Sequence, residues 1–143
     1  MKIRNGFVSN SSSSSFIVKG YLLDDKDFDE KTIMEKFGYY TEENIKKYTY
    51  IDSNGEEHLG ESGMFWDFKD KHADISFLNG NDDGVEKGKI LIGEKLYDSY
   101  DSEYADLPDM ILSAEPSKIT QEIADKLDLK DEKIIIACGT RCC

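Results

Sequence analysis

The stretch FIVKGYLL, residues 16–23, decides the fold, because it is the first run of the chain that combines apolar side chains with residues that favour strands. It is preceded by the serine tract Ser11–Ser15 and followed by the acidic segment DDKDFDE, residues 24–30. We interpret the run as the first strand, the acidic segment as its exit loop, and the serines as an extended lead-in. The sequence therefore predicts a lead-in over residues 1–15 and a single domain over residues 16–143.

Helical patterns follow this strand in two places and recur near the C-terminus. Asp29 is placed to cap a helix that ends at Gly38, and Thr41 is placed to cap a second helix that ends at Tyr48. Ser117 is placed to cap a third helix, in which apolar residues repeat every four positions. The residues that form these apolar faces are Ile33, Met34, Phe37, Ile119, Ile123 and Leu127. We therefore expect about three helices.

Strand-like segments separate the helices. A hairpin is predicted after Tyr48–Ile51, because Asn54-Gly55 allows the positive φ of a tight turn. Trp66 lies in a further aromatic run that we interpret as a strand, so its side chain is expected to belong to the core. The runs interpreted as strands are Met64–Phe68, Asp74–Leu78 and Ile90–Ile92. The short turns between them favour antiparallel pairing.

The last apolar run, Lys133–Cys138, contains Ile134–Ala137 without polar alternation. Such a pattern is typical of a strand that is buried on both faces, so we predict a position in the interior of the sheet. Together the segments predict an α+β fold, a single domain with a mainly antiparallel sheet and about three helices.

Charge and hydropathy limit the classes of partner. With 30 acidic against 18 basic residues the net charge is −12, which disfavours direct binding to DNA or RNA because the phosphates are repelled. A basic protein surface is the better electrostatic match. No apolar run reaches the length of about 18 residues that a membrane helix needs, and no signal-peptide pattern is present. We expect no membrane partner and a cytoplasmic location.

The N-terminal segment Arg4–Phe16, RNGFVSNSSSSSF, resembles the start of a group of small, mostly uncharacterised phage-encoded and bacterial proteins. The resemblance covers residues 1–18. It implies a phage or bacterial origin and transfers no activity and no catalytic residue. A phosphate-binding loop is disfavoured, because a lone Gly6 precedes the serines and the strand comes after them, the reverse of a Walker loop.

The segment Tyr97–Met110 is the best candidate for a partner surface. Its tyrosines alternate with carboxylates, and tyrosine supplies contact area while carboxylates steer the approach of a basic partner. The predicted partner-binding residues are Tyr97, Asp98, Tyr100, Asp101, Glu103 and Tyr104. The alternative is a solvated loop whose tyrosines pack inward.

The three cysteines, Cys138, Cys142 and Cys143, crowd at the C-terminus. Thiolates are ligands of zinc and of iron–sulfur clusters, but no C-x-x-C spacing is present and a fourth ligand would come from His58 or His72 far upstream. An odd number of cysteines is a poor disulfide framework and fits free thiols in a reducing compartment. We predict no cofactor, and keep a metal or redox site at these cysteines as the alternative.

The segment Asn79–Gly84 imitates the start of a calcium loop, with oxygen-bearing side chains at alternate positions. The twelfth position is Ile90, which lacks the bidentate carboxylate that such a loop needs. We interpret this segment as a hairpin turn.

These patterns predict a non-catalytic acidic interaction protein, encoded by a phage. It would serve either as an accessory component of a phage assembly or as a binder that modulates a host protein, in the host cytosol or in association with the virion. The alternative is an enzyme, or a redox or metal-binding protein, that uses the C-terminal cysteines.

Overall fold

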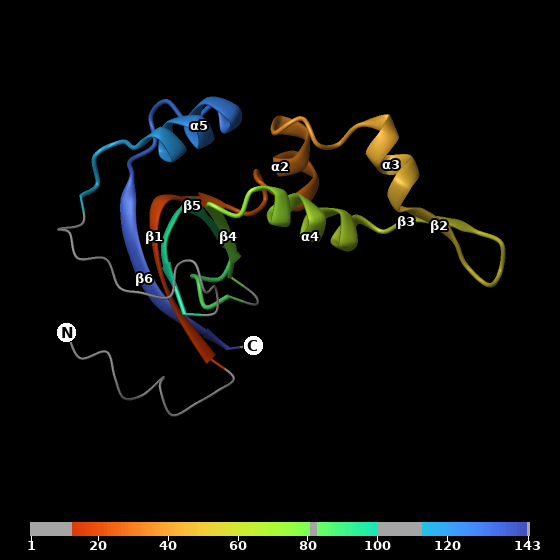
Figure 1. Ribbon diagram of the computed structural model, residues 1–143, viewed down its shortest axis with the longest axis horizontal. Coiled ribbons are helices and arrows are strands. Elements are labelled where there is room, and N and C mark those ends of the chain that lie inside the picture. Colours follow the sequence, from red (N-terminus) through yellow and green to blue (C-terminus); the bar gives the residue numbers. More distant parts are fainter. Residues whose placement is uncertain (1–12, 81–82, 100–112, 143) are drawn as a thin grey trace.

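The computed structural model describes residues 13–80, 83–99 and 113–142. The strands are β1 (Ser13–Asp24), β2 (Thr49–Ile51), β3 (Glu57–Leu59), β4 (Ile75–Asn79), β5 (Lys89–Asp98) and β6 (Ile135–Cys142). The helices are α2 (Glu30–Lys36), α3 (Glu42–Tyr48), α4 (Glu61–Lys71) and α5 (Lys118–Leu127). An antiparallel sheet has the strand order β4-β5-β1-β6, and β2 pairs with β3 alone (Figure 1). The predicted α+β class is confirmed, with four helices in the described residues instead of about three.

Strand β1 is the centre of the sheet, because β5 pairs with one of its edges and β6 with the other. Phe16 and Val18 pack in a smaller apolar cluster on one face, and Tyr21 and Leu23 pack in a larger cluster on the other face. Helices α2, α4 and α5 add buried side chains to the larger cluster. The first strand is confirmed, but it already begins at Ser13, within the segment that the sequence assigned to the lead-in.

A pair of glycines lies where β1 meets β5. Gly20 and Gly93 are register partners. Both strands are strongly curved (Figure 1). A Cβ atom at Gly20 would lie 2.2 Å from the carbonyl oxygen of Ile92, and a Cβ atom at Gly93 would lie 2.5 Å from that of Lys19. Both distances are far below van der Waals contact, so the strands can pair here only because both residues lack a side chain.

The three predicted helix caps are formed at Asp29, Thr41 and Ser117. In each case the side-chain oxygen accepts a hydrogen bond from the backbone amide three residues later, which satisfies a free donor of the first turn. Gly38, with φ of +76°, follows the end of α2 as expected. The residues of these helices that are fully covered are Ile33, Met34, Thr120, Ile123 and Leu127.

The predicted strand over Met64–Phe68 is wrong, because these residues lie within helix α4. Met64, Phe65 and Phe68 are buried and share one helical face, whereas the side chain of Trp66 is 64% exposed. The expectation that Trp66 belongs to the core is therefore also wrong. Aromatic content favours strands, but the spacing of the buried residues fits a helix that packs on α2 and α3.

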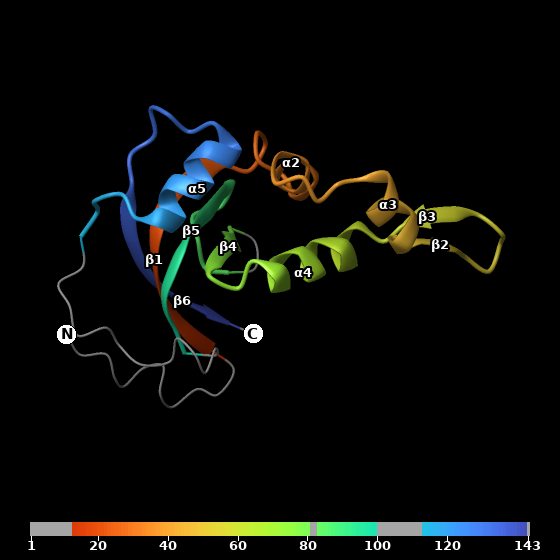
Figure 2. The ribbon, with the colours of Figure 1, turned by 45° about the horizontal axis from the view of Figure 1, so that its top comes forward.

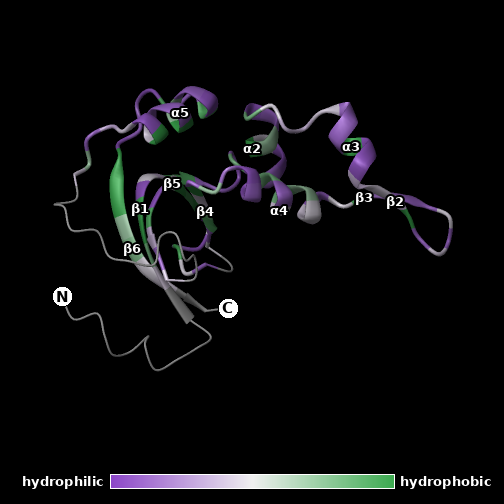
Figure 3. Cartoon of the chain, in the orientation of Figure 1, coloured by the Kyte–Doolittle hydropathy of each residue, from purple (hydrophilic) through white to green (hydrophobic). Residues whose placement is uncertain are grey.

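The predicted interior position of the last strand is wrong as well. Strand β6 pairs with β1 and forms one edge of the sheet in the described residues. Ile134 packs against the larger cluster, and Ile135 and Ala137 pack against the smaller one, which explains the absence of polar alternation. All three residues remain partly exposed. Figure 3 shows that the first part of β6 is hydrophobic along its length.

The chain between β1 and β4 leaves the sheet and returns to it. Helix α4 extends away from the sheet beside α2, and α3 and the β2–β3 hairpin lie at its far end (Figures 1 and 2). We call residues 42–71, from α3 to the end of α4, the arm.

An aromatic cluster joins the arm to the sheet. The ring of Phe68 lies 5.3 Å from that of Phe77 in β4, measured between centroids, and 4.8 Å from that of His72. Phe37, which follows α2, completes the cluster at 5.2 Å from His72. Burial lowers the pKa of His72 below its usual value of 6.5, with a small contribution from Lys126 and Lys71 that the carboxylate of Glu122 opposes.

We predict that Gly93→Ala destabilises the protein by at least about 1–3 kcal/mol, because the new methyl group meets backbone atoms of β1 that cannot move independently. Gly63→Ala in α4 is the matched control: nothing lies within 4 Å of its added Cβ, so the substitution should stabilise by about 0.5–1 kcal/mol. Chemical denaturation of both variants measures the difference. Equal stability of the two variants would disprove the close approach of β1 and β5.

We predict that the free energy of unfolding decreases when the pH is lowered from 7.5 to 5.5. The unfolded chain binds a proton at His72 with a pKa of about 6.5, whereas the folded state binds it less readily because its pKa is lowered. The neutral ring therefore makes its full contribution to the free energy of unfolding above about pH 6.5. This contribution is lost as the pH falls towards the pKa of His72 in the folded state.

Denaturation curves at three pH values test this for the wild type and His72→Phe. The phenylalanine variant keeps a ring in the cluster but should lose the contribution of His72 to the pH dependence. An unchanged pH slope in His72→Phe would contradict the assignment.

Candidate functional site

Three large hydrophobic side chains are exposed in the described residues, and all three lie on the arm. Tyr50 is 55% exposed, Ile51 66% and Trp66 64%, whereas the buried hydrophobic residues of the sheet and of α5 are at most 7% exposed. Exposed apolar groups that gather on one part of a surface mark a candidate interaction site. The arm is therefore the candidate functional site of this structure.

The β2–β3 hairpin forms the tip of the arm and confirms the predicted Asn-Gly turn. The amide of Gly55 donates to the carbonyl of Asp52 (3.0 Å), and the amide of Asp52 donates to the carbonyl of Glu56 (2.9 Å). Gly55 has φ of +84°, while Asn54 does not have a positive φ. The loop is thus a turn of three residues, Ser53–Gly55, with glycine in the left-handed region.

The hairpin has two different faces, because side chains alternate along each strand. Tyr50 and His58 are register partners, and their rings lie 5.5 Å apart with an angle of 34° between the planes. Asp52 and Glu56 are one further step along the same face. Ile51 and its register partner Glu57 lie on the opposite face. One face therefore carries polar groups and the other carries an exposed isoleucine.

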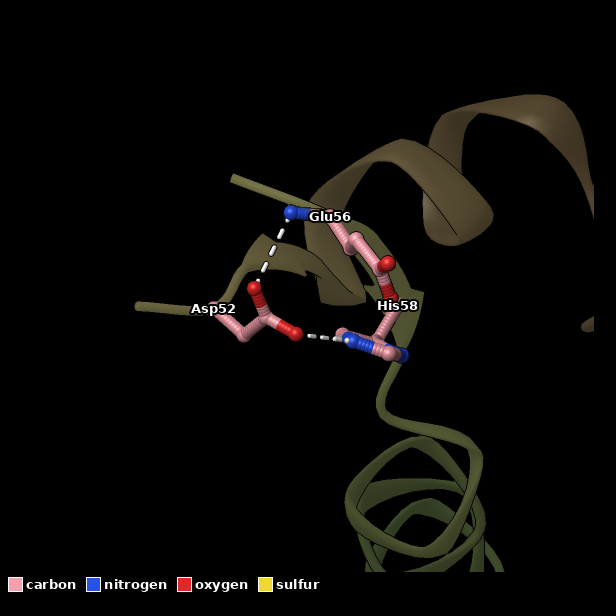
Figure 4. Close-up of side chains that lie close together, drawn as sticks. All are labelled: Asp52, Glu56 and His58. Atoms are coloured by element: carbon pink, nitrogen blue, oxygen red, sulfur yellow. Dashed lines mark hydrogen bonds and ion pairs between the residues drawn. The ribbon is translucent and has the colours of Figure 1, made fainter. Parts of the chain in front are cut away.

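Three potential ligands of a cation meet on the polar face (Figure 4). The Oδ1 atom of Asp52 accepts hydrogen bonds from the amides of Asn54 (2.8 Å) and Glu56 (2.9 Å), and Oδ2 lies 2.6 Å from Nε2 of His58. One ligand atom each from Asp52, Glu56 and His58 lies within 4.8 Å of the others. The hydrogen bond from the Glu56 amide, followed by that from His58, lowers the pKa of Asp52, which keeps its carboxylate charged.

The other face of the hairpin forms a shallow depression with α3. Its volume is about 490 Å³, and the apolar side chains of Ile45 and Ile51 contribute to its lining. Glu42, Lys46 and Glu57 complete the lining together with Thr49, so charged groups surround the two isoleucines. This arrangement can receive an aliphatic side chain that is flanked by a cationic group.

Trp66 is the second exposed feature of the arm. It lies on α4, on the side away from the buried residues of that helix. The Nζ atom of Lys69 lies 5.1 Å from the centre of the Trp66 ring and 5.2 Å from that of Phe65, so the lysine bridges the exposed ring and the core. The indole ring is left available as a contact surface.

Hydrogen bonds fix α3 on α4. The hydroxyl of Tyr48 donates to Oδ2 of Asp67, and the hydroxyl groups of Tyr48 and Tyr39 lie 3.3 Å apart. The hydrogen bond to Asp67 raises the pKa of Tyr48, because the phenol must keep its proton to donate. Thr49 donates to the carbonyl of Ile45 (2.6 Å), which joins α3 to the first residue of the hairpin. The arm is therefore held at its far end by several side chains.

The structure describes only two of the six predicted partner-binding residues. Tyr97 is half-buried at the end of β5, and Asp98, the last residue of that strand, is only 5% exposed. The carboxylate of Asp98 is therefore not part of an exposed acidic strip. Tyr100, Asp101, Glu103 and Tyr104 lie outside the described residues. Partner binding by this segment stays a prediction.

The C-terminal cysteines do not form a compact group in the described residues. Cys138 is exposed and free, and β6 continues beyond it to Cys142. Four residues of an extended strand span about 13 Å, which is too far for these two cysteines to share a metal ion or a disulfide. Cys143 lies outside the described residues.

The segment Asn79–Gly84 starts at the last residue of β4 and belongs to the connection to the antiparallel strand β5, as the hairpin interpretation predicts. Oδ2 of Asp83 accepts a hydrogen bond from the amide of Asn79 (3.0 Å), and Gly84 has φ of +75°. Residues 81–82 lie outside the described part of the chain.

A second hollow lies beside α5, with a volume of about 620 Å³. It is lined by Tyr21 of β1, by residues of α5 such as Gln121 and Asp125, and by the loop that leads to β6. The hydroxyl of Tyr21 donates to the carbonyl of Thr120 at 3.4 Å, and burial raises the pKa of Tyr21. Carboxylates and lysines of opposite charge are mixed in this lining, so it favours no single class of ligand.

No family model, curated protein or solved structure matches this chain significantly. In the part of the chain that the structure describes, no helix is long and apolar enough to cross a membrane.

The sequence contains a signal for the polar face of the hairpin. Once Asn54-Gly55 is taken as a turn, the alternation of strands places Asp52 on the same face as Glu56 and His58. No pattern in the neighbouring sequence predicts that Ile51 and Trp66 are exposed. Their exposure depends on the way the arm extends from the sheet.

Proposed function

We propose that this protein is a non-catalytic interaction protein that captures a basic protein partner with its arm. The observation that carries the proposal is the joint exposure of Tyr50, Ile51 and Trp66 on one projecting part of the molecule. Tyrosine and tryptophan are enriched at the energetic centres of protein interfaces. Together with Ile51, the exposed tyrosine and tryptophan supply the contact area that a partner needs.

Charge supports a basic partner. Residues 42–61 contain six carboxylates and two lysines, so the far end of the arm is acidic within an acidic chain. Glu42 and Glu57 line the depression that contains Ile45 and Ile51. Carboxylates around an apolar centre accelerate the approach of a cationic surface and fix its orientation, while the apolar centre supplies most of the affinity.

The N-terminal resemblance suggests where to look for the partner. If the chain is phage-encoded, the partner is either another component of a phage assembly or a host protein that the phage modulates. Both classes are compatible with a location in the host cytosol. The acidic surface continues to disfavour direct binding to nucleic acid.

The alternative function, an enzyme or a redox or metal protein built on Cys138, Cys142 and Cys143, has less support. The extended backbone of β6 separates residues 138 and 142, and in the described part of the chain no cluster of potential ligands includes a cysteine.

We predict that simultaneous alanine substitution of Tyr50, Ile51 and Trp66 weakens partner binding more than about tenfold. The partner is identified by mass spectrometry of co-purified proteins and its affinity is then measured with purified components. Since the three side chains are exposed, each substitution should change the free energy of unfolding by no more than about 0.5 kcal/mol relative to the wild type. Gln121→Ala with Lys130→Ala, on the exposed lining of the hollow beside α5, is the control and should bind normally.

If the triple variant keeps its affinity for the partner and the control loses affinity, the partner binds at the hollow beside α5 and not at the arm. Charge reversal at Asp101 and Glu103 tests the segment that the sequence singled out. A loss of binding in that variant alone would assign partner capture to residues 97–110 and would refute the arm.

A further inference from the structure

We propose that the polar face of the β2–β3 hairpin binds a divalent transition-metal ion of the zinc class, through Asp52, Glu56 and His58. This site is independent of the proposed partner binding, because it needs only the isolated chain. It is carried by the convergence of an imidazole and two carboxylates from both sides of the hairpin turn, with Asp52 directly after β2, Glu56 directly before β3 and His58 within β3 (Figure 4).

The geometry fits a single ion. The three ligand atoms lie within 4.8 Å of one another, and zinc takes imidazole nitrogen and carboxylate oxygen at about 2.0–2.2 Å. An ion between them needs only small side-chain rotations, because Oδ2 of Asp52 and Nε2 of His58 are already 2.6 Å apart and Glu56 shares their face. A fourth position would be left open for water or another ligand.

The backbone and a neighbouring ring hold two of the ligands in place. Oδ1 of Asp52 accepts hydrogen bonds from the backbone amides of Asn54 and Glu56. These bonds fix the carboxylate so that Oδ2 faces His58. The ring of Tyr50 lies beside the imidazole at 5.5 Å. The hairpin therefore orients Asp52 and His58 before an ion arrives, which reduces the conformational entropy that binding would otherwise cost.

The ligand set determines the class of ion. Imidazole favours zinc, copper and nickel over calcium and magnesium, which take only oxygen ligands. In this structure the contact between His58 and Asp52 is a hydrogen bond, so the ion replaces its proton. If the ring starts with protons on both nitrogens, the Nε2 proton is released to solvent when the ion binds. If the ring starts neutral, its single proton ends on Nδ1, which leaves Nε2 free to bind the ion. The neighbouring carboxylates of the arm add a favourable field for a cation.

The experiment uses the full-length chain with Cys138→Ser, Cys142→Ser and Cys143→Ser, so that thiols do not compete for the metal. Zinc chloride is titrated by calorimetry, and the ring proton signals of both histidines are followed by NMR. We expect one ion per chain and a shift of the His58 signals, while the signals of His72, in the aromatic cluster, stay unchanged.

His58→Gln and Glu56→Gln should each reduce zinc affinity more than about tenfold. Glu56→Gln keeps the hairpin intact, because the turn uses the backbone of Glu56 and not its side chain. Glu43→Gln removes an exposed carboxylate of the arm outside the cluster and should bind zinc like the parent. Absence of binding up to millimolar zinc, or equal affinity in the parent and both cluster variants, would overturn the proposal.

Discussion

The pairing of β1 on both edges is the constraint on which the rest of the structure depends. Strands β5 and β6 are far from β1 in the sequence, and both pair with it. Both faces of β1 contribute side chains to apolar clusters. The glycine pair at Gly20 and Gly93 permits this arrangement, since any side chain at either position would separate β1 from β5. Burial of the apolar strand supplies the driving force, and the glycines define where the strands can meet.

The arm follows from this constraint. The residues between β1 and β4 take no part in the pairing of β1, β4 and β5, so that stretch leaves the sheet and returns, while α2 and α4 within it cover the larger cluster. Phe68 and its aromatic neighbours fix the point of departure, and the hydrogen bond between Tyr48 and Asp67 fixes the far end. What remains outside these contacts is the hairpin and the outer face of α4, which carry the exposed side chains of the proposed interface.

Local features could be predicted from the sequence, and features that depend on distant pairing could not. Helix caps and the Asn-Gly turn require only neighbouring residues, and each forms as expected. The MFWDF segment was misread because aromatic residues favour strands in isolation, while the contacts that make it a helix come from α2 and α3. The edge position of β6 is likewise set by pairing with β1. The same limit applies to the candidate site, whose hairpin was predictable but whose exposure was not.

Trp66 offers the most direct measurement of the central claim, because it is the only tryptophan of the chain. Quenching of its fluorescence by acrylamide can be compared in the free protein and in the purified complex with its partner. We expect strong quenching and red-shifted emission in the free protein, and protection of the same ring in the complex. A ring that is shielded in the free protein, or one that is equally accessible in both states, would contradict the claim that the arm exists to be covered by a partner.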